Sequence, residues 1–324
     1  MNPLSNIELY DIAVRLAAYH EQIKNYVLAE VLAPIPDMAD AMQTRIMRVK
    51  GELGSIRQGD FLKLIRDIEG LRNEVMTGQA AMLEKRMAEI GKNVIALTSK
   101  ISLSETIIDP SDSQAKRYLG RLKPGMFGRP GNVDRVLRAT ANMPMADIGL
   151  TAKELTKATQ ERAKRGLYGM LRAARAAHTK KNELIPQLEI DYRGGPIRSI
   201  VGNLGSLVRT SIHQVHTLGS AAVLSAVYDQ YIWHSVLDSR TTEICRALHM
   251  RRFYYGRGPM PPRHLNCRSS ISAVSSNEKS VPDENFSEWM GRQSNPVQRD
   301  LIDLIDVKMA PAKIFDKFKR ILGR

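Results

Sequence analysis

Both cysteines of this 324-residue chain, Cys245 and Cys267, lie in one short block together with His249 and His264. Three residues separate Cys245 from His249, and two separate His264 from Cys267, so the block offers four metal-ligating side chains in two closely spaced pairs. Zinc binds four such ligands in a tetrahedron. The spacing therefore permits a zinc site formed by Cys245, His249, His264 and Cys267.

The same residues allow two other interpretations. A disulfide between Cys245 and Cys267 requires an oxidising compartment or late oxidation, because cytosolic thiols stay reduced. Alternatively, the cysteines are two buried or half-buried free thiols beside a histidine that caps a turn. The residue types and their spacing leave zinc, disulfide and free thiols open.

Three polar residues ahead of the first cysteine favour a structural role. Asp238, Arg240 and Thr241 follow the apolar run 231–237 and are typical of a turn in which Asp238 accepts backbone N–H groups and starts a helix. Arg240 would then bind a nearby carboxylate or carbonyl. We expect no activated nucleophile here, because the serines lack a Gly-x-Ser-x-Gly context, and we expect the adjacent His234 at the surface.

The block also carries a longer pattern. Its members are Trp233, Asp238, Arg240, Thr241, Cys245, Arg246, Ala247 and Leu248, followed by Gly258, Pro259, Met260, Pro261, Pro262, His264, Asn266, Cys267 and Arg268. This pattern resembles the core motif of the phage head morphogenesis proteins of the Mu F type. That motif reads roughly W-x-x-x-x-D-x-R-T-C-x-x-C-R-A-L-x-G, then a turn rich in Gly and Pro, then P-P-x-H-x-N-C-R-C.

The chain departs from the family pattern at three positions. Thr242 stands where the family has its first cysteine, Met250 where it often has glycine, and Ser269 where it has the last cysteine of C-R-C. The resemblance continues on both sides of the block, in LVRTSIHQV from Leu207 and in EWMGRQSNPVQ from Glu288. It covers about residues 195 to 300.

The resemblance implies a minor head protein of a tailed phage. Members of this family are expected in a small number of copies at the portal vertex, in contact with the portal protein and other virion head proteins, where they act in head assembly or DNA delivery. The implied locations are the virion and, during assembly, the host cytoplasm.

The positive charge of the chain is concentrated in one segment. Between Lys116 and Lys181 there are sixteen Lys and Arg but four Asp and Glu, which accounts for +12 of the overall +14. A dense basic surface binds polyanions, because neutralised phosphates release their counterions. This segment therefore favours contact with packaged DNA or with an acidic protein surface.

Within this segment we expect an exposed irregular loop, Gly120 to Asn132, followed by a helix. Thr151 and Glu154 resemble a capping box that opens a helix running to about Ala177. At 100 degrees per residue, five basic side chains share one side of that helix, and apolar residues share the other. The candidate nucleic-acid-binding residues are Lys153, Lys157, Lys164, Arg172 and Arg175. The alternative is an ordinary solvated helix face.

The fold class expected is α+β, with a mainly helical N-terminal half, a small core module and a helical tail. The expected regions are 1–110 (helical), 111–195 (basic loop and helix), 196–275 (core module) and 276–324 (loop and tail). A capping box at Ser5 and Glu8 opens a helix to about Leu32, which Pro34 and Pro36 end, and an apolar seam from Phe61 to Leu97 is interrupted at Gly78.

In the core module we expect a short strand in LEIDYRGGP, where Leu188, Ile190 and Tyr192 alternate, and a helix from about Ile200 to Val227. His213 and His216 share a face of that helix; such a pair can bind a metal, but without a third ligand we expect polar contacts at the surface or in the core. Strands are expected at 231–237, 253–255 and 271–274, packed on the helix.

The C-terminal residues predict an amphipathic helix that packs on its own domain or on a partner. Its apolar face holds Ile314, Phe315, Phe318, Ile321 and Leu322. No run approaches the eighteen apolar residues of a membrane span, and no signal-peptide pattern opens the chain. We therefore expect no membrane association and synthesis in the bacterial cytoplasm.

Two other functions remain as alternatives. A metal-dependent nuclease would use Cys245, His249, His264 and Cys267 with Asn266 nearby, but the proposed ligand set leaves no free histidine to activate water. A DNA-binding protein outside the virion would use the basic helix alone. We expect a protein that is not an enzyme and has no cofactor other than a possible zinc ion.

Overall fold

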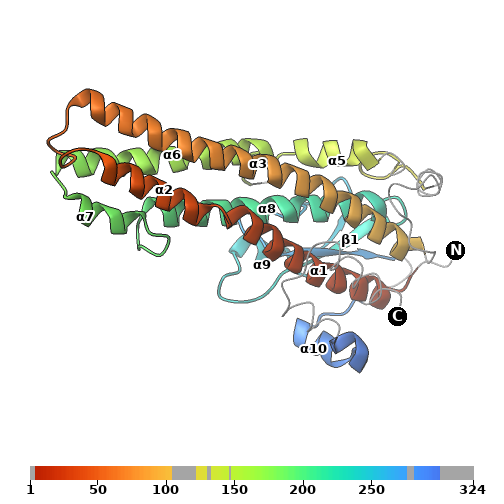
Figure 1. Ribbon diagram of the computed structural model, residues 1–324. Coiled ribbons are helices and arrows are strands. Elements are labelled where there is room, and N and C mark those ends of the chain that lie inside the picture. Colours follow the sequence, from red (N-terminus) through yellow and green to blue (C-terminus); the bar gives the residue numbers. More distant parts are fainter. Residues whose placement is uncertain (1–3, 104–121, 130–132, 146, 276–280, 300–324) are drawn as a thin grey trace. The chain divides into compact units, whose positions relative to one another are not determined.

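The computed structural model describes residues 4–103, 122–129, 133–145, 147–275 and 281–299 (Figure 1). The fold is α+β and mostly helical, as the sequence predicts. The helices are α1 (Asn6–Leu32), α2 (Ile35–Arg48), α3 (Gln58–Leu103), α5 (Val133–Asn142), α6 (Ala152–Ala176), α7 (Lys181–Leu184), η1 (Ile185–Leu188, 3-10), α8 (Pro196–Leu224), α9 (Glu243–Leu248) and α10 (Phe286–Gly291). The strands are β1 (Gln230–His234), β2 (Arg252–Tyr254) and β3 (Ser270–Val274).

The chain folds into two compact units, each assembled from segments that are distant in sequence. The first, which we call the sheet unit, comprises Met1–Tyr26, Arg86–Ala152 and Arg209–Arg324. The second, the helical unit, comprises Val27–Lys85 and Lys153–Val208. The four consecutive regions expected from the sequence stay a prediction. Shifts in composition along the chain mark turns and loops, but they do not reveal which distant segments pack together.

The sheet unit contains one antiparallel sheet in the order β2-β1-β3. In its register Tyr231 lies opposite Phe253 on one side and Ala273 on the other. Ala273 packs with Leu224 of α8 and Leu9 of α1 in one buried cluster. The three expected strands and their packing on the preceding helix are therefore confirmed, and α8 begins and ends within four residues of its expected limits.

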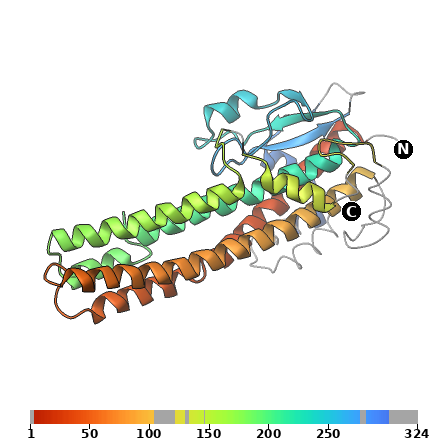
Figure 2. The ribbon, with the colours of Figure 1, turned by 90° about the horizontal axis from the view of Figure 1, so that it is seen from above.

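In the helical unit, α2, the first part of α3 and α6 run alongside one another (Figures 1 and 2). Arg72 of α3 is buried and donates a hydrogen bond to the Gln160 carbonyl of α6 at 2.7 Å. At one end of α6, the Arg175 guanidinium lies 4.5 Å from the centre of the Phe61 ring. These polar and cation–π contacts fix α6 against α3 over much of its length.

The capping residues and prolines in the sequence predicted the helix ends correctly. The Glu8 N–H donates to Ser5 Oγ at 3.3 Å, and the Ser5 N–H donates to the Glu8 carboxylate at 2.8 Å, which confirms the capping box. Pro34 is the N-cap of α2, so the first helix ends where the prolines predict. The helix expected from Thr151 to Ala177 is α6.

Two expectations about secondary structure were wrong. The apolar seam is not interrupted at Gly78, because α3 continues through it, and a single glycine in a helix costs only about 1 kcal/mol. The segment LEIDYRGGP forms successive turns instead of a strand: the Tyr192 N–H donates to the Glu189 carbonyl, and the Gly195 N–H donates to the Tyr192 carbonyl. Tyr192 is 42% exposed although Leu188 is buried, so the alternation marks no shared buried face.

Part of the basic loop and the whole predicted tail helix, from Ile314 to Leu322, lie outside the described residues. Residues 122–129 are irregular, as expected, but they are not simply exposed. Leu122 and Phe127 pack on a core cluster that includes Ile95 and Val136. Among the residues that the structure describes, no helix combines the length and the apolar character needed to cross a membrane.

Candidate functional site

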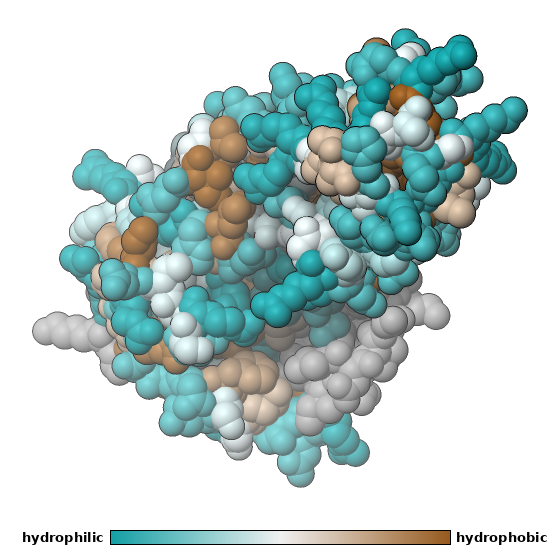
Figure 3. Space-filling model, turned by 90° about the vertical axis from the view of Figure 1, so that its left-hand side faces the viewer, coloured by the Kyte–Doolittle hydropathy of each residue, from teal (hydrophilic) through white to brown (hydrophobic). Residues whose placement is uncertain are grey.

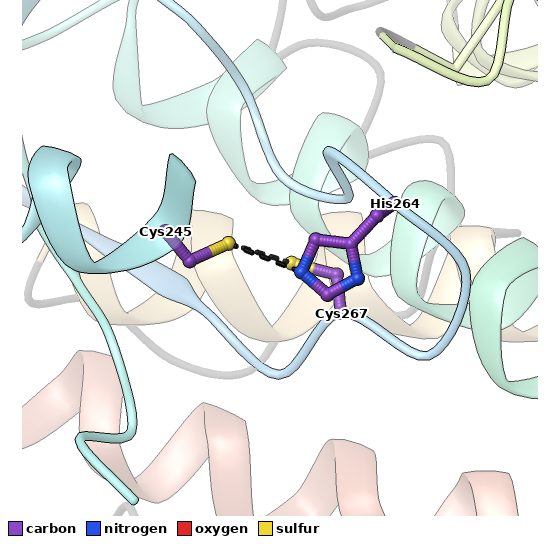
Figure 4. Close-up of side chains that lie close together, drawn as sticks. All are labelled: Cys245, His264 and Cys267. Carbon is purple, nitrogen blue, oxygen red and sulfur yellow. Dashed lines mark hydrogen bonds between the residues drawn. The ribbon is translucent and has the colours of Figure 1, made fainter. Parts of the chain in front are cut away.

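Cys245, His264 and Cys267 come together in the sheet unit (Figure 4). The Cys245 Sγ atom lies 3.3 Å from His264 Nε2 and 3.8 Å from Cys267 Sγ. Within the described part of the chain, this is the only group of three or more His, Cys and acidic side chains whose ligand atoms are close enough to share a metal ion. We call it the Cys-His cluster.

The first ligand is positioned by the short helix α9. Thr242 caps this helix, and its Oγ1 accepts the N–H of Cys245 at 3.4 Å. The Cys245 side chain then enters a buried cluster with Trp233 and Cys267, on which Leu248, Phe253 and Ile271 pack. Trp233 is fully buried and packs in the same cluster as both cysteines.

The other two ligands come from one tight turn that α8 holds in place. The Cys267 N–H donates to the His264 carbonyl at 3.2 Å, and Asn266 adopts a left-handed backbone with φ of 58°, which asparagine tolerates better than most residues. Asn266 N–H also donates to Thr210 Oγ1 at 3.0 Å. His213 Nδ1 donates to the Cys267 carbonyl at 2.6 Å, because a carbonyl can only accept. Two residues of α8 thus anchor the turn.

The two thiols differ in their affinity for a proton. A hydrogen bond from the Cys267 thiol, followed by contacts with Ser269, Thr242 and His264, lowers the pKa of Cys245 to about 5 although burial opposes this shift. The same bond to Cys245, together with burial, raises the pKa of Cys267. Cys245 is therefore the thiol of the pair that loses its proton more readily, and the thiolate is the form that binds metals.

His249 does not belong to the Cys-His cluster, contrary to the four-ligand site that the spacing suggested. Its Nδ1 accepts the Ser235 N–H at 3.1 Å, and its Nε2 lies 3.5 Å from Asp283 Oδ1. A spacing of four residues places two side chains on one face only while the helix continues. Here α9 ends at Leu248, and His249 has left the helical conformation with ψ of 133°, so its ring points elsewhere.

Asp238 accepts a backbone N–H group, as the sequence predicts, and it also binds an arginine that the sequence did not identify. Its carboxylate accepts the Arg240 N–H at 2.9 Å and binds both guanidinium nitrogens of Arg268, at 2.8 and 2.5 Å. The Arg268 hydrogen bonds lower the pKa of Asp238. Arg240, expected to be the clamping residue, is 77% exposed in its side chain and lies 3.8 Å from the carboxylate. The helix is capped by Thr242, not by Asp238.

The sequence analysis did not predict the surroundings of Cys245 and of His234 correctly. Thr242 and Ser269, which stand where the family pattern has cysteines, both contact the Cys245 sulfur. The comparison with the family pattern could have identified them, because both positions hold cysteine in that pattern and lie close to Cys245 in the motif. His234, expected at the surface, is half-buried: its Nε2 lies 2.7 Å from Ser272 Oγ, and burial lowers its pKa to about 4.

His213 and His216 lie in the core of the sheet unit, as polar contacts rather than as metal ligands. The His216 ring stacks on His20 of α1 with centroids 4.4 Å apart, and the His213 ring meets His20 edge-on at 5.0 Å. Burial lowers the pKa values of His213 and His216 to about 3 and that of His20 well below its usual range. These rings line a pocket between α1, α8 and β3.

The five basic residues of the candidate DNA-binding face are not equally available. Lys153, Lys157 and Arg172 are exposed on α6. Lys164, by contrast, pairs with Glu69 at 2.8 Å, and Arg175 donates to the Gln58 side chain and to the Ile56 carbonyl. Three of the five side chains are therefore free of such contacts, and two help to hold α6 on α3.

Comparisons with known proteins give no relative: no family model, no curated protein and no solved structure matches this chain.

Proposed function

We propose that this chain is a minor head protein of a tailed phage, acting near the portal in head assembly, genome delivery or both. The observation that carries the proposal is that the motif residues resembling the Mu F pattern form one packed element. Trp233, Cys245 and Cys267 share a buried cluster, although 34 positions separate the first from the last. Asp238 and Arg268 close the element with a bidentate ion pair.

The motif therefore acts as a scaffold that holds α9 and the 264–267 turn on the sheet. Three large apolar side chains of this scaffold are exposed instead of packed: Val236 at 47%, Leu237 at 53% and Ile244 at 48%. The face drawn in Figure 3 is mainly hydrophilic, with hydrophobic residues in separate small groups, as is common on protein surfaces. Since Val236, Leu237 and Ile244 contribute little to the core, they are suited to contact another head protein.

Serine substitutions at Val236, Leu237 and Ile244 are expected to reduce incorporation of this protein into phage heads at least tenfold. The reason is that interface energy concentrates in a few apolar side chains, and these three can be changed without opening a cavity. The measurement is the protein composition and infectivity of purified particles made with the variant as the only copy, while capsid shells still form.

The matched control replaces three exposed apolar residues outside the motif, Ile7, Met47 and Leu62, with serine. This control is expected to be incorporated normally. Normal incorporation and full infectivity of the motif variant would contradict a role of this surface in assembly, and absence of the wild-type protein from particles would contradict the proposed function as a whole.

Binding to DNA is expected to be independent of base sequence and to weaken steeply with salt. Each phosphate contact contributes a slope of about 0.9 in log K against log salt. Glutamine at Lys153, Lys157 and Arg172 should reduce that slope by about 0.9 for each phosphate that is no longer neutralised, without unfolding α6, because glutamine is a good helix former. Fluorescence anisotropy with duplex DNA at several salt concentrations measures both quantities.

The control for this experiment removes three exposed positive charges from α3 of the same unit, Lys63, Arg66 and Lys85. A specific α6 face predicts a larger change in slope for the α6 variant than for this equally charged control. Equal slopes for both variants would instead indicate a solvated helix face and general electrostatic attraction. Cleavage of plasmid DNA with added divalent metal would support the nuclease alternative.

A further inference from the structure

Two separations within the Cys-His cluster match those between ligands of a tetrahedral zinc ion. With zinc–sulfur bonds of about 2.3 Å, two sulfurs of a tetrahedral site lie about 3.8 Å apart, and a sulfur and a histidine nitrogen lie about 3.5 Å apart. The observed separations are 3.8 Å between the sulfurs and 3.3 Å between Cys245 Sγ and His264 Nε2. A disulfide would need sulfurs about 2.05 Å apart, and both cysteines are free.

The orientation of the His264 ring independently favours a cation. His264 Nδ1 lies 2.9 Å from the Leu265 carbonyl, which can only accept, so Nδ1 carries the proton. In the neutral ring, Nε2 then presents its lone pair toward the Cys245 sulfur. A histidine whose other nitrogen donates to a backbone carbonyl is the usual arrangement of a metal ligand.

Two electron-rich atoms, Nε2 and the Cys245 sulfur, therefore face each other at close range. A proton shared with a thiol, or a metal ion bound to both, must lie between them to offset their repulsion. One proton can satisfy only one such pair, whereas a zinc ion contacts Nε2 and both sulfurs at once. We propose that Cys245, His264 and Cys267 bind one zinc ion through their two sulfurs and Nε2.

The stoichiometry of this site follows from the three ligands. Both cysteines bind the ion as thiolates, so each thiol proton still present leaves to solvent when the ion enters. The fourth position is open to water, because His264 is half-exposed and His249 is held by the Ser235 N–H. Thr242 and Ser269 contact the Cys245 sulfur and orient it from outside the ligand set.

The test uses the full chain, purified without a histidine tag from cells grown with zinc. Elemental analysis is expected to give about one zinc per chain. Exchange for cobalt(II) is expected to produce the intense visible bands of a four-coordinate ion and a sulfur-to-cobalt charge-transfer band in the near ultraviolet. His264→Gln and Cys267→Ser should reduce the metal content to near zero after desalting, whereas His249→Gln, the matched control, should retain it.

Folding is checked separately, because Cys267 is buried whereas His264 is half-exposed. If circular dichroism shows that His264→Gln keeps its native helix content while it has lost the metal, the site is supported. This holds even where Cys267→Ser fails to fold. In the wild-type protein, the two thiols should react with a thiol reagent only after a chelator is added. Three results would overturn the proposal. The first is a wild-type protein that contains no metal and has two freely reactive thiols. The others are a mass lower by two hydrogens, which indicates a disulfide, and loss of zinc in His249→Gln.

Discussion

Replacing Trp233 with alanine is expected to lower the free energy of unfolding by about 3–5 kcal/mol, the range found for large aromatic residues in protein cores. Trp233 is fully buried and packs on both cysteines, so the smaller side chain leaves a cavity at the centre of the motif. The substitution also removes the hydrogen bond from Nε1 to Ser235 Oγ at 2.8 Å. Urea unfolding followed by circular dichroism measures the change.

The control is Tyr254→Ala on the neighbouring strand β2, where the side chain is 55% exposed. A change of less than about 0.5 kcal/mol is expected there, because no buried volume is removed. Trp233→Phe should fall between the two variants. A Trp233→Ala protein as stable as Tyr254→Ala would show that the indole is not the core of the motif.

Acid is expected to destabilise the sheet unit well above the pH at which carboxylates are protonated. His216 has a folded-state pKa of about 3, lowered by burial and then by Lys24. In the unfolded chain a histidine titrates near pH 6.5, so between these values the unfolded state binds a proton that the folded state does not. Stability is therefore fully present above about pH 6.5 and falls as the pH decreases.

The expected loss is about 2 kcal/mol for each such histidine between pH 7 and pH 5. His20 follows the same rule, because burial is also the first cause of its lowered pKa, followed by repulsion from His216 and Lys24. Urea midpoints at pH 7, 6 and 5 measure the trend. His216→Gln should reduce the loss of stability between pH 7 and pH 5 by the contribution of one histidine. An unchanged loss of stability in that variant would mean that His216 does not titrate as the structure implies.

Local signals in the sequence predicted most of the secondary structure. The Ser5–Glu8 capping box, the prolines after Leu32 and the three apolar runs of the sheet each act through neighbouring residues, so they can be recognised without knowing the fold. The failures were also local. The isolated Gly78 predicts an interruption, but α3 continues through it. The alternation in LEIDYRGGP predicts a strand, but this segment forms turns.

The site was predicted in part. The sequence identified Cys245, His264 and Cys267, but it added His249 and did not identify Arg268 as the partner of Asp238. Both points concern where a side chain lies once its element ends. The end of α9 turns His249 away, and Arg268 reaches Asp238 across 30 positions of sequence. Spacing along a chain cannot predict such contacts, because they depend on how α8, the sheet and the turn pack.

One departure from the family pattern now has a physical explanation. Met250, at a position where the family often has glycine, has a φ of 59°, in the left-handed region that glycine adopts without strain. Methionine there costs roughly 1–2 kcal/mol of backbone energy. The Met250 N–H donates to the Trp233 carbonyl at 2.8 Å, so the strained residue still continues the pairing beside the motif.

The position of the two sulfurs also bears on how this protein resists proteases. Cys245 and Cys267 stand 22 positions apart and enclose β2, a strand that pairs with β1 at only three positions. A zinc ion bound by both sulfurs, as proposed above, would restrict the unfolded chain by the equivalent of about 3 kcal/mol. Partial opening of the sheet unit would then leave this loop closed and its backbone poorly accessible to cleavage. We expect the enclosed segment to be among the last parts of this protein that an added protease cleaves.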